Sequence, residues 1–424
     1  MMRRVYVRAY EPERCRSVQW FGGRPAVKFL FDDKAFSFQA LRTAGHAACG
    51  GADLGEVLVT CEDVPDGNEA AWCRAWSATA ARLHRTGDDA LAAGHRVSAR
   101  EALLRASNYY RAADFFRLDD RDHDRESDRL ALHSRETFAS AAALFDTPVV
   151  PQRIPYEGTT LPGYLFLAGP TDEPRPTVIH HGGYDSTLEE LYFMVGAGAL
   201  RRGYHVLAFE GPGQQSVRRE QGLAFRPDWE AVVTPVVDHA LTLPGVDADR
   251  LVLFGTSFGG LLGARAAAFD RRFAACVLHN GIYDFYRLPL TVIPAHLAEW
   301  VAESRDEVAG PALAVAMSHS TQLRWFLRHG MWAFGAKTPA EALRACMPYN
   351  LDGVAEHITC PTLVLDAEND VVARGEAQRV HAALRAEKDL IRFAAADGSG
   401  EHCQEGAALH FHQRVFDWLD ERGI

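Results

Sequence analysis

The sequence predicts an α/β fold, in which a mostly parallel sheet is covered by helices on both faces and preceded by a helical segment. From Pro148 onwards, short apolar runs alternate with helical patterns, which is typical of a buried parallel sheet. One apolar run, 251–254, leads directly into a Gly-x-Ser-x-Gly turn and then into a helix. Before Pro148 the pattern is mainly helical, so we divide the chain into residues 1–147 and 148–424.

The composition limits the classes of function. The 424 residues, 47% of them hydrophobic, can bury a large core. An excess of 56 acidic over 45 basic residues gives a net charge of −11, which argues against nucleic acid or an anionic membrane as a partner. The sequence has no apolar membrane-spanning stretch and no signal-peptide core, and its eight cysteines are scattered without a Cys-x-x-Cys pair. We therefore expect a cytoplasmic protein without a disulfide framework or a metal site.

Three main helices are expected in the N-terminal segment. An Ala-rich stretch over 69–93 carries apolar residues at helical spacing. Ser98 and Glu101 form the pattern of a capping box, so the next helix is expected to span 99–117. A third helix is predicted over 127–145.

Strands and helices alternate through the C-terminal part. Helices are expected at 188–202, at 229–243, after the Gly-x-Ser-x-Gly turn and at 407–421. An aromatic-rich helical stretch over about 284–349 interrupts this alternation, and we interpret it as a lid over the carboxyl edge of the sheet. The segments expected to be extended are 4–10, 26–31, 149–155, 160–168, 177–181, 204–210, 251–254, 273–279, 362–366 and 390–394.

The strongest functional signal is Ser257, at the centre of the Gly-x-Ser-x-Gly turn. Such a turn is tight, so its flanking residues have to be small and its serine is held in a strained conformation above the sheet. The serine also lies at the positive end of the following helix, which suits a nucleophile. We predict that Ser257 is a nucleophile; the alternative is a glycine-rich turn with an incidental serine.

A nucleophilic serine needs a neutral imidazole to accept its proton and a carboxylate to orient that imidazole. After this type of turn, the acid and then the histidine follow in the sequence. Asp370 lies in the loop after the predicted strand 362–366 and is the expected acid. Asp366 and Glu368 are rivals, although Asp366 is expected to end the strand. His402, in the loop before the final helix, is the expected base.

The other histidines are expected to be structural. His410 and His412 lie two residues apart on the final helix, so they point to different faces. Cys403 has no advantage over Ser257 as a nucleophile, because the tight turn belongs to the serine. The remaining histidines considered are His180, His279, His319, His329, His357 and His381.

The oxyanion that forms when a serine attacks a carbonyl group needs preorganised N–H donors. The backbone amide of Phe258, directly after the nucleophile, is one expected donor. The second is expected in the loop 182–185, where glycines let the backbone approach the substrate. Both Gly183 and Tyr184 are candidates for this second donor.

Two further glycine motifs do not indicate a nucleotide site. Gly196-Ala-Gly198 lies inside a predicted helix and does not complete a dinucleotide-binding pattern. The segment 210–216 follows a strand but lacks the Gly-Lys-Ser/Thr end of a phosphate-binding loop. We interpret it as a tight turn bordering the site, and we expect no cofactor.

Several segments carry a resemblance to a known family. They are 105–116 (RASNYYRAADFF), 181–190 (HGGYDSTLEE), 210–214 (EGPGQ), 228–238 (DWEAVVTPVVD) and the Gly-x-Ser-x-Gly turn. Through them, the chain from about residue 99 onwards resembles the α/β-hydrolase group that contains 2,6-dihydroxypseudooxynicotine hydrolase, with fungal yellowish-green-type polyketide-shortening hydrolases, esterases and acyl-peptidase-like proteins nearby. The resemblance implies an N-terminal helical cap, a homodimer, and a triad of Ser257, Asp370 and His402. Relatives cleave esters or carbon–carbon bonds next to a ketone.

We therefore expect a serine hydrolase that cleaves an ester, or a carbon–carbon bond adjacent to a ketone, in a small aromatic or polyketide-like molecule. Ser257 would form an acyl-enzyme, with His402 as general base and then acid. An acyltransferase or cyclase is the main alternative, because an aromatic-rich lid would exclude water. A peptidase and a non-catalytic ligand-binding protein are further alternatives.

Overall fold

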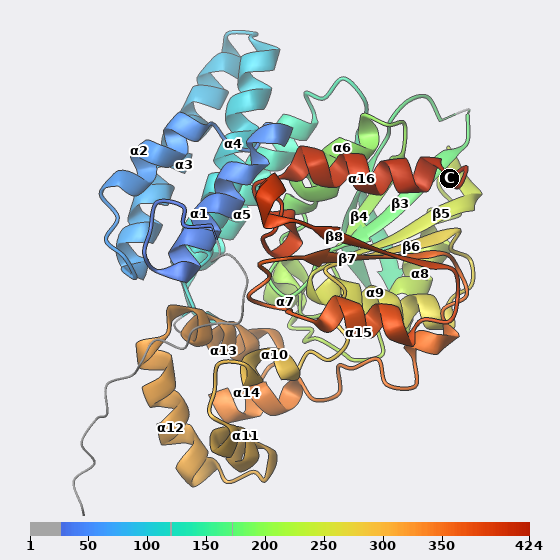
Figure 1. Cartoon of the computed structure of the whole chain (residues 1–424). Helices are drawn as coiled ribbons and strands as arrows, with labels where there is room; N and C mark the ends of the chain where they lie inside the picture. Colours follow the sequence, from blue (N-terminus) through green and yellow to red (C-terminus); the bar gives the residue numbers. More distant parts are fainter. Residues whose placement is uncertain (1–26, 119–120, 172) are drawn as a thin grey trace, which may run out of the picture.

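The structure, a computed structural model, describes residues 27–118, 121–171 and 173–424. Figure 1 shows three parts: the helices α1–α5, a central sheet with helices on both sides, and a group of helices, α10–α14, that projects from the sheet domain. The segment 4–10, expected to be extended, lies outside the described residues. The described part of 26–31 contains no strand.

The centre of the molecule is a sheet for which the described residues supply eight strands, in the order β1-β2-β4-β3-β5-β6-β7-β8. β2 pairs with β1 and β4 in antiparallel orientation, and all pairs from β4 to β8 are parallel. The expected mostly parallel sheet is therefore confirmed. The strands are β1 (Val149–Tyr156), β2 (Thr159–Phe166), β3 (Arg175–His181), β4 (His205–Phe209), β5 (Val246–Thr256), β6 (Ala275–His279), β7 (Thr362–Ala367) and β8 (Lys388–Phe393).

Helices cover both faces of this sheet, which explains why the inner strands β4, β6 and β7 are buried along their whole length. In β5, Leu251 and Leu253 face one hydrophobic core, whereas Val252 and Phe254 face the other. The helices on the first face are α8 (Glu230–Ala240), α9 (Phe258–Phe269) and α15 (Glu376–Ala383). Those on the second face are α6 (Ala197–Leu200) and α16 (Ala408–Asp420). A short α7 (Gln215–Gln221) follows β4.

The N-terminal helices form a bundle with its own core around the buried Trp72 and Trp76. The Ser98–Glu101 capping-box prediction is wrong, because the helix begins three residues earlier than expected, at Arg96. Its N-cap residue is His95, so Ser98 lies inside the first turn. The helices are α1 (Lys34–Gly45), α2 (Leu54–Glu62), α3 (Glu69–Ala92), α4 (Arg96–Asp114) and α5 (Arg125–Ala142).

The aromatic-rich insertion between β6 and β7 is helical, as expected. An isolated bridge between Asp284 and Asn350 closes its base, and buried aliphatic residues such as Leu313 and Leu327 form its core. Within the described ranges, no helix is both long and apolar enough to cross a membrane. The insertion contains α10 (Arg287–Leu290), α11 (Ala295–Ala302), α12 (Asp306–His319), α13 (Thr321–Ala333) and α14 (Pro339–Ala345).

The helix expected over 188–202 is present over 190–200, but it is not α-helical throughout. A π-helical turn, Tyr192–Gly196, is followed by the short α6 (Ala197–Leu200). The ring of His412 on α16 packs against Gly198, where an added Cβ would lie 2.5 Å from the ring. His412 Nε2 also donates a hydrogen bond to the Met194 carbonyl at 2.6 Å. This contact from another element accompanies the change in helical winding.

Candidate active site

Ser257 occupies the tight turn between β5 and α9. Its backbone has φ 58° and ψ −123°, a conformation that L-residues rarely adopt and that is held only by the surrounding structure. A Cβ added at Gly255 would lie 2.0 Å from the Gly259 carbonyl oxygen, so no larger residue fits there. The Ser257 amide donates to the His279 carbonyl at 2.8 Å, which fixes the turn against β6. The strained turn with small flanking residues, expected from the sequence, is therefore present.

The structure brings Ser257, His402 and Asp370 together, although they lie up to 145 residues apart in the chain. Ser257 Oγ lies 2.8 Å from His402 Nε2, and His402 Nδ1 lies 2.8 Å from Asp370 Oδ2. Asp370 and His402 are both buried, with 2% and 7% of their surfaces exposed. Three side chains from three different loops thus form one continuous hydrogen-bonded chain.

The Asp370 carboxylate is fully hydrogen-bonded. Its Oδ1 accepts the backbone amides of Val372 and Ala373 at 2.7 and 2.8 Å. Burial alone would raise the pKa of Asp370, but the His402 ring and these hydrogen bonds lower it below its ordinary value. The group is therefore held as a carboxylate that accepts the Nδ1 proton of His402.

The pKa of His402 is shifted in the opposite direction from that of Asp370. Burial would lower its pKa, but the adjacent Asp370 carboxylate and hydrogen bonding raise that pKa well above the ordinary value for histidine. The Asp370 carboxylate therefore stabilises the protonated form of the His402 ring.

The sequence did not identify Asn280 as part of this site. Asn280 follows β6 with φ 56°, a left-handed conformation that asparagine tolerates better than most residues. Its Nδ2 donates to Asp370 Oδ2 at 2.6 Å, and its Oδ1 accepts the Cys403 amide at 3.2 Å. Asn280 thus links the acid loop to the histidine loop. The signal in the sequence was a polar residue before a glycine at the end of a buried strand.

The expected oxyanion loop lies directly against the Ser257 turn. A Cβ added at Gly183 would lie 2.6 Å from the Thr256 carbonyl oxygen and 2.8 Å from the Phe258 amide nitrogen. The Gly183 amide donates to Ser186 Oγ at 3.4 Å. Phe258 is the first residue of α9, so its amide has no carbonyl partner within the helix. The glycine here permits the close backbone approach that was expected.

The side chain of Tyr184 connects this loop to the helical insertion. Its hydroxyl donates to the Phe326 carbonyl at 2.9 Å, and its carbonyl oxygen accepts His329 Nε2 at 2.8 Å. The turn 210–216 contacts the loop 182–185, because Gln214 Nε2 donates a hydrogen bond to the Gly182 carbonyl at 2.8 Å. The expectation that this turn borders the site agrees with this contact.

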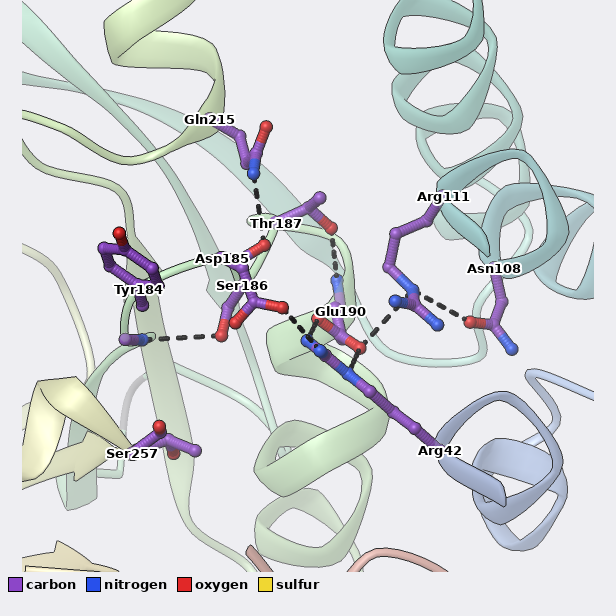
Figure 2. Close-up of polar contacts among 12 residues, drawn as sticks. Arg42, Asn108, Arg111, Tyr184, Asp185, Ser186, Thr187, Glu190, Gln215 and Ser257 are labelled. Atoms are coloured by element: carbon purple, nitrogen blue, oxygen red, sulfur yellow. Dashed lines mark hydrogen bonds and ion pairs between the residues drawn. The ribbon is translucent and has the colours of Figure 1, made fainter. Parts of the chain in front are cut away.

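Two arginines of the N-terminal helices hold the far end of the same loop (Figure 2). Arg42 on α1 donates to Asp185 at 2.6 Å and, through two nitrogens, to Glu190 at 2.5 and 2.8 Å. Arg111 on α4 lies 3.4 Å from Glu190. Burial would raise the pKa of Glu190, but Arg111 and Arg42 lower it to about 2. A buried charged cluster therefore joins the helical segment to the loop beside Ser257.

Ser257 lines a cavity of about 120 Å³. Its floor includes Ser257 and His402, and its walls are largely apolar. The N-terminal segment contributes Phe38, Arg42 and Phe115; the insertion and adjoining loops contribute Ile282, Phe285, Leu288, Trp325, Phe326, Val371 and Val372.

A larger cavity of about 340 Å³ adjoins the first but contains none of the three hydrogen-bonded residues. Phe115, Asp185 and Trp325 line both cavities, so these side chains form the wall between them. The Phe115 and Trp325 rings are stacked with centroids 4.8 Å apart. The second cavity is lined mainly by charged and polar side chains, among them Asp114, Arg121, Arg135, Glu189, Glu210 and Arg219.

The rival residues lie outside the hydrogen-bonded chain. Asp366 ends β7 and accepts Gln378 Nε2 at 2.6 Å, and Glu368 accepts the Ala395 amide at 2.8 Å. His412 is buried against α6, as a packing residue would be.

The fold and the strand–turn–helix around Ser257 define an α/β hydrolase. The α/β-hydrolase family profile matches residues 177–413, and that of the FrsA-like esterases matches residues 60–286. The chain is 37% identical to the hydrolase acrC of Aspergillus aculeatus over 91% of this chain and 96% of that protein. It is 36% identical to the 20-hydroxy-prefusarin hydrolase FUS2 of Gibberella moniliformis, over 92% and 97% of the two chains. The protein therefore belongs to the α/β-hydrolase family and is an enzyme of that class.

A solved structure, that of 2,6-dihydroxy-pseudo-oxynicotine hydrolase, shares the fold over most of both chains. The two structures superpose with a TM-score of 0.70 and 23% sequence identity, over 88% of this chain and 94% of the other. The similarity includes the region of the N-terminal helices, since it extends well beyond the sheet domain.

Proposed function

We propose that the enzyme is a serine hydrolase with Ser257 as nucleophile, His402 as general base and then acid, and Asp370 as the group that orients His402. The observation that carries this proposal is the continuous chain of two 2.8 Å contacts from Ser257 Oγ through His402 to Asp370. Hydrogen-bonded nucleophile, base and orienting acid are the geometric requirement for activating a serine hydroxyl.

The reaction follows from this geometry. Ser257 Oγ attacks a carbonyl carbon while its proton passes to His402 Nε2, and the positive charge that forms on His402 is stabilised by Asp370. His402 then gives this proton to the leaving group, which departs and leaves an acyl-enzyme on Ser257 and a neutral His402. A water molecule, deprotonated by His402, then attacks the acyl group and releases the acid.

The Phe258 and Tyr184 amides are the donors that we assign to the oxyanion, with Gly183 as the alternative to Tyr184. Tyr184 is favoured because the Gly183 amide already donates to Ser186 Oγ. Removal of one such donor costs about 10²- to 10³-fold in kcat in related chemistry.

The substrate that we propose is a small aromatic or polyketide-like molecule cleaved at an ester or at a carbon–carbon bond next to a ketone. An aromatic wall around Ser257 supports this proposal, because flat apolar molecules pack well against aromatic rings. The names of the relatives, a 20-hydroxy-prefusarin hydrolase and a 2,6-dihydroxy-pseudo-oxynicotine hydrolase, point in the same direction.

The test uses 4-nitrophenyl butyrate and 1-phenylbutane-1,3-dione as ester and diketone probes. We expect the wild-type enzyme to cleave at least one of them and to incorporate one oxygen from ¹⁸O-labelled water into the acid product. We also expect a fluorophosphonate probe to label Ser257, located by peptide mass spectrometry. Turnover without labelling at Ser257, or labelling at another serine, would contradict the nucleophile assignment.

Acyl transfer or cyclisation is the second candidate, because aromatic side chains from both helical parts enclose the serine and limit the access of water. Adding an alcohol acceptor separates the two functions. A hydrolase gives mainly the free acid, whereas an acyltransferase gives mainly the new ester at millimolar acceptor.

The homodimer and the cytoplasmic location stay predictions. Apolar residues exposed on α2, including Leu54, Leu58 and Val59, support a surface for self-association. Light scattering coupled to size-exclusion chromatography would measure the mass of the particle in solution, and a monomer across the micromolar range would contradict the dimer.

A further inference from the structure

Glu405 is a buried carboxyl group in the pocket of Ser257 that has no role in the triad. It follows His402 by three residues and lines the same cavity as Ser257 and His402. Only 8% of its side chain is exposed. Among the described residues its carboxyl group makes no hydrogen bond, and its ion-pair contact is with Arg42 Nε at the long distance of 3.8 Å. The carboxyl group faces the cavity rather than a protein partner, so it is free to hydrogen-bond with a ligand that occupies the cavity.

The surrounding charges explain the state of this carboxyl group. The two guanidinium groups that face it, of Arg42 and Arg111, are already paired with the carboxylates of Asp185 and Glu190. Burial raises the pKa of Glu405 to about 8; Arg42, Arg111 and His402 lower that pKa, and Glu190 raises it. This pKa favours the protonated carboxyl group at neutral pH, and no residue in the described part of the chain accepts a hydrogen bond from it.

We propose that Glu405 is a second catalytic acid, which protonates the departing enolate oxygen of a 1,3-dicarbonyl substrate. This inference rests on the proposed serine hydrolase function and specifies its substrate class. A carboxyl O–H that lines the nucleophile's pocket without an acceptor is complementary to a second substrate oxygen, beyond the one in the oxyanion hole.

The proton balance of the step is complete. Ser257 adds to one carbonyl group and its proton passes to His402. When the tetrahedral intermediate collapses, the carbon–carbon bond breaks and its electron pair forms the enolate of the second carbonyl group. Glu405 gives its proton to that enolate oxygen, which releases an enol and leaves a carboxylate beside Arg42. The proton on His402 then returns to Glu405 through water, so His402 is neutral again for hydrolysis of the acyl-enzyme.

A carbon–carbon cleavage needs this second acid more than an ester cleavage does. In an ester the leaving oxygen belongs to the broken bond, so His402 can protonate it directly. In a 1,3-dicarbonyl compound the enolate oxygen lies two bonds away from the carbon that leaves. The group that protonates the enolate oxygen must therefore lie at a different position from His402 in the same small pocket. Glu405 lines that pocket.

The test compares Glu405→Gln with the wild-type enzyme on 1-phenylbutane-1,3-dione and 4-nitrophenyl butyrate. The nitrophenolate anion leaves without a proton, whereas the enolate needs one. A general acid contributes about 10²- to 10⁴-fold, so we expect the ratio of diketone kcat to ester kcat to fall at least about 100-fold in Glu405→Gln. Glu405→Asp, which keeps a carboxyl group, should recover part of this ratio.

The matched control is Glu401→Gln. Glu401 is a buried carboxyl group of the same loop, but it accepts the Val27 amide at 2.9 Å and does not line the cavity. Its substitution should leave the diketone-to-ester ratio unchanged, even if the protein becomes less stable.

The pH profile gives a second readout that a structural role would not move. Glu405 must be protonated to act, so the diketone rate of the wild-type enzyme should fall as the pH rises through about 8. The ester rate should lack this decline, and so should the residual diketone rate of Glu405→Gln.

Three outcomes would overturn the proposal: an equal loss on both substrates, no loss on either, or a wild-type enzyme that hydrolyses the ester but leaves the diketone intact. Failure of the serine hydrolase function itself looks different, because Ser257→Ala would then retain activity on the nitrophenyl ester.

Discussion

The loops that carry the triad and the helical parts that cover it are held in different ways. Ser257, Asp370 and His402 lie at the ends of strands of one sheet and are fixed by short contacts with their own turns. The cover comes from α1–α5 and α10–α14, which reach the site through side chains such as Arg42 and Trp325. The difference teaches that the strand ends position the residues proposed for the reaction, whereas the helical parts determine the shape and charge of the space around them. This separation can be tested by substitutions in each region.

The largest effect is expected for Ser257→Ala. Triad members act as a unit, and loss of the nucleophile in a serine hydrolase costs about 10⁶-fold in kcat. Ester hydrolysis should fall by this order while the unfolding midpoint changes little. Ser318→Ala, on the exposed surface of α12, is the control and should keep full activity. Comparable activity in the two variants would refute the role of Ser257.

Asp370→Asn should cost about 10⁴-fold, because the amide favours the wrong tautomer of the histidine. It should also move the acid limb of the kcat/KM profile to lower pH. Neutral His402 is the active form, and the Asp370 carboxylate is what raises its pKa, so removing that charge lowers the pKa. NMR titration of His402 in both proteins measures the shift, and an unchanged or raised pKa would contradict this account.

Arg42→Met should mainly weaken the attachment of the N-terminal helices to the loop that carries Asp185 and Glu190. Removing one partner of a buried ion pair leaves Asp185 and Glu190 uncompensated, which costs about 3–5 kcal/mol in the free energy of unfolding. Arg129→Met removes the pair with Glu126, in which the Arg129 side chain is 49% exposed, and should cost about 0–1 kcal/mol. Denaturant unfolding of both variants gives the comparison. Equal costs would show that the cluster at Arg42 is not a stabilising connection.

Trp325→Leu is expected to have the smallest effect. It removes one ring of the stacked pair that borders the Ser257 cavity and should enlarge this largely apolar cavity, so that longer acyl chains fit. We expect the kcat/KM preference between long-chain and short-chain nitrophenyl esters to change by about one order of magnitude, the discrimination that a hydrophobic pocket gives per methylene group. Trp300→Leu, in the same insertion but outside both cavities, should leave that preference unchanged.

Most of the α/β domain could be predicted because its signals are local. Each buried strand is an apolar run, and the Ser257 turn needs its glycines within two residues. Chain order then pointed to Asp370 and His402, whose side chains the structure brings together with Ser257. Two details were not predicted. The helix expected over 188–202 contains a π-helical turn close to Gly198, against which His412 of α16 packs, and α4 begins at Arg96 rather than after Ser98.

Asn280 and Glu405 were missed for a related reason. Each is a single polar residue without a motif, and its importance depends on which groups surround it after folding. Asn280 matters because β6 brings it between Asp370 and Cys403. Glu405 matters because Arg42 and Arg111, from a different part of the chain, are already paired with other carboxylates.

The sequence by itself determined the fold class and the strained Gly-x-Ser-x-Gly turn, and it pointed to Asp370 and His402 as partners of Ser257, since periodicity and turn chemistry are properties of neighbouring residues. Only the tertiary structure decided how the pocket is closed and charged. The wall of Phe115 and Trp325, the cluster at Arg42 and the raised pKa of Glu405 all depend on burial and on contacts between segments far apart in the chain. The free energies of such contacts are set by distance and desolvation, which the order of residues alone does not reveal.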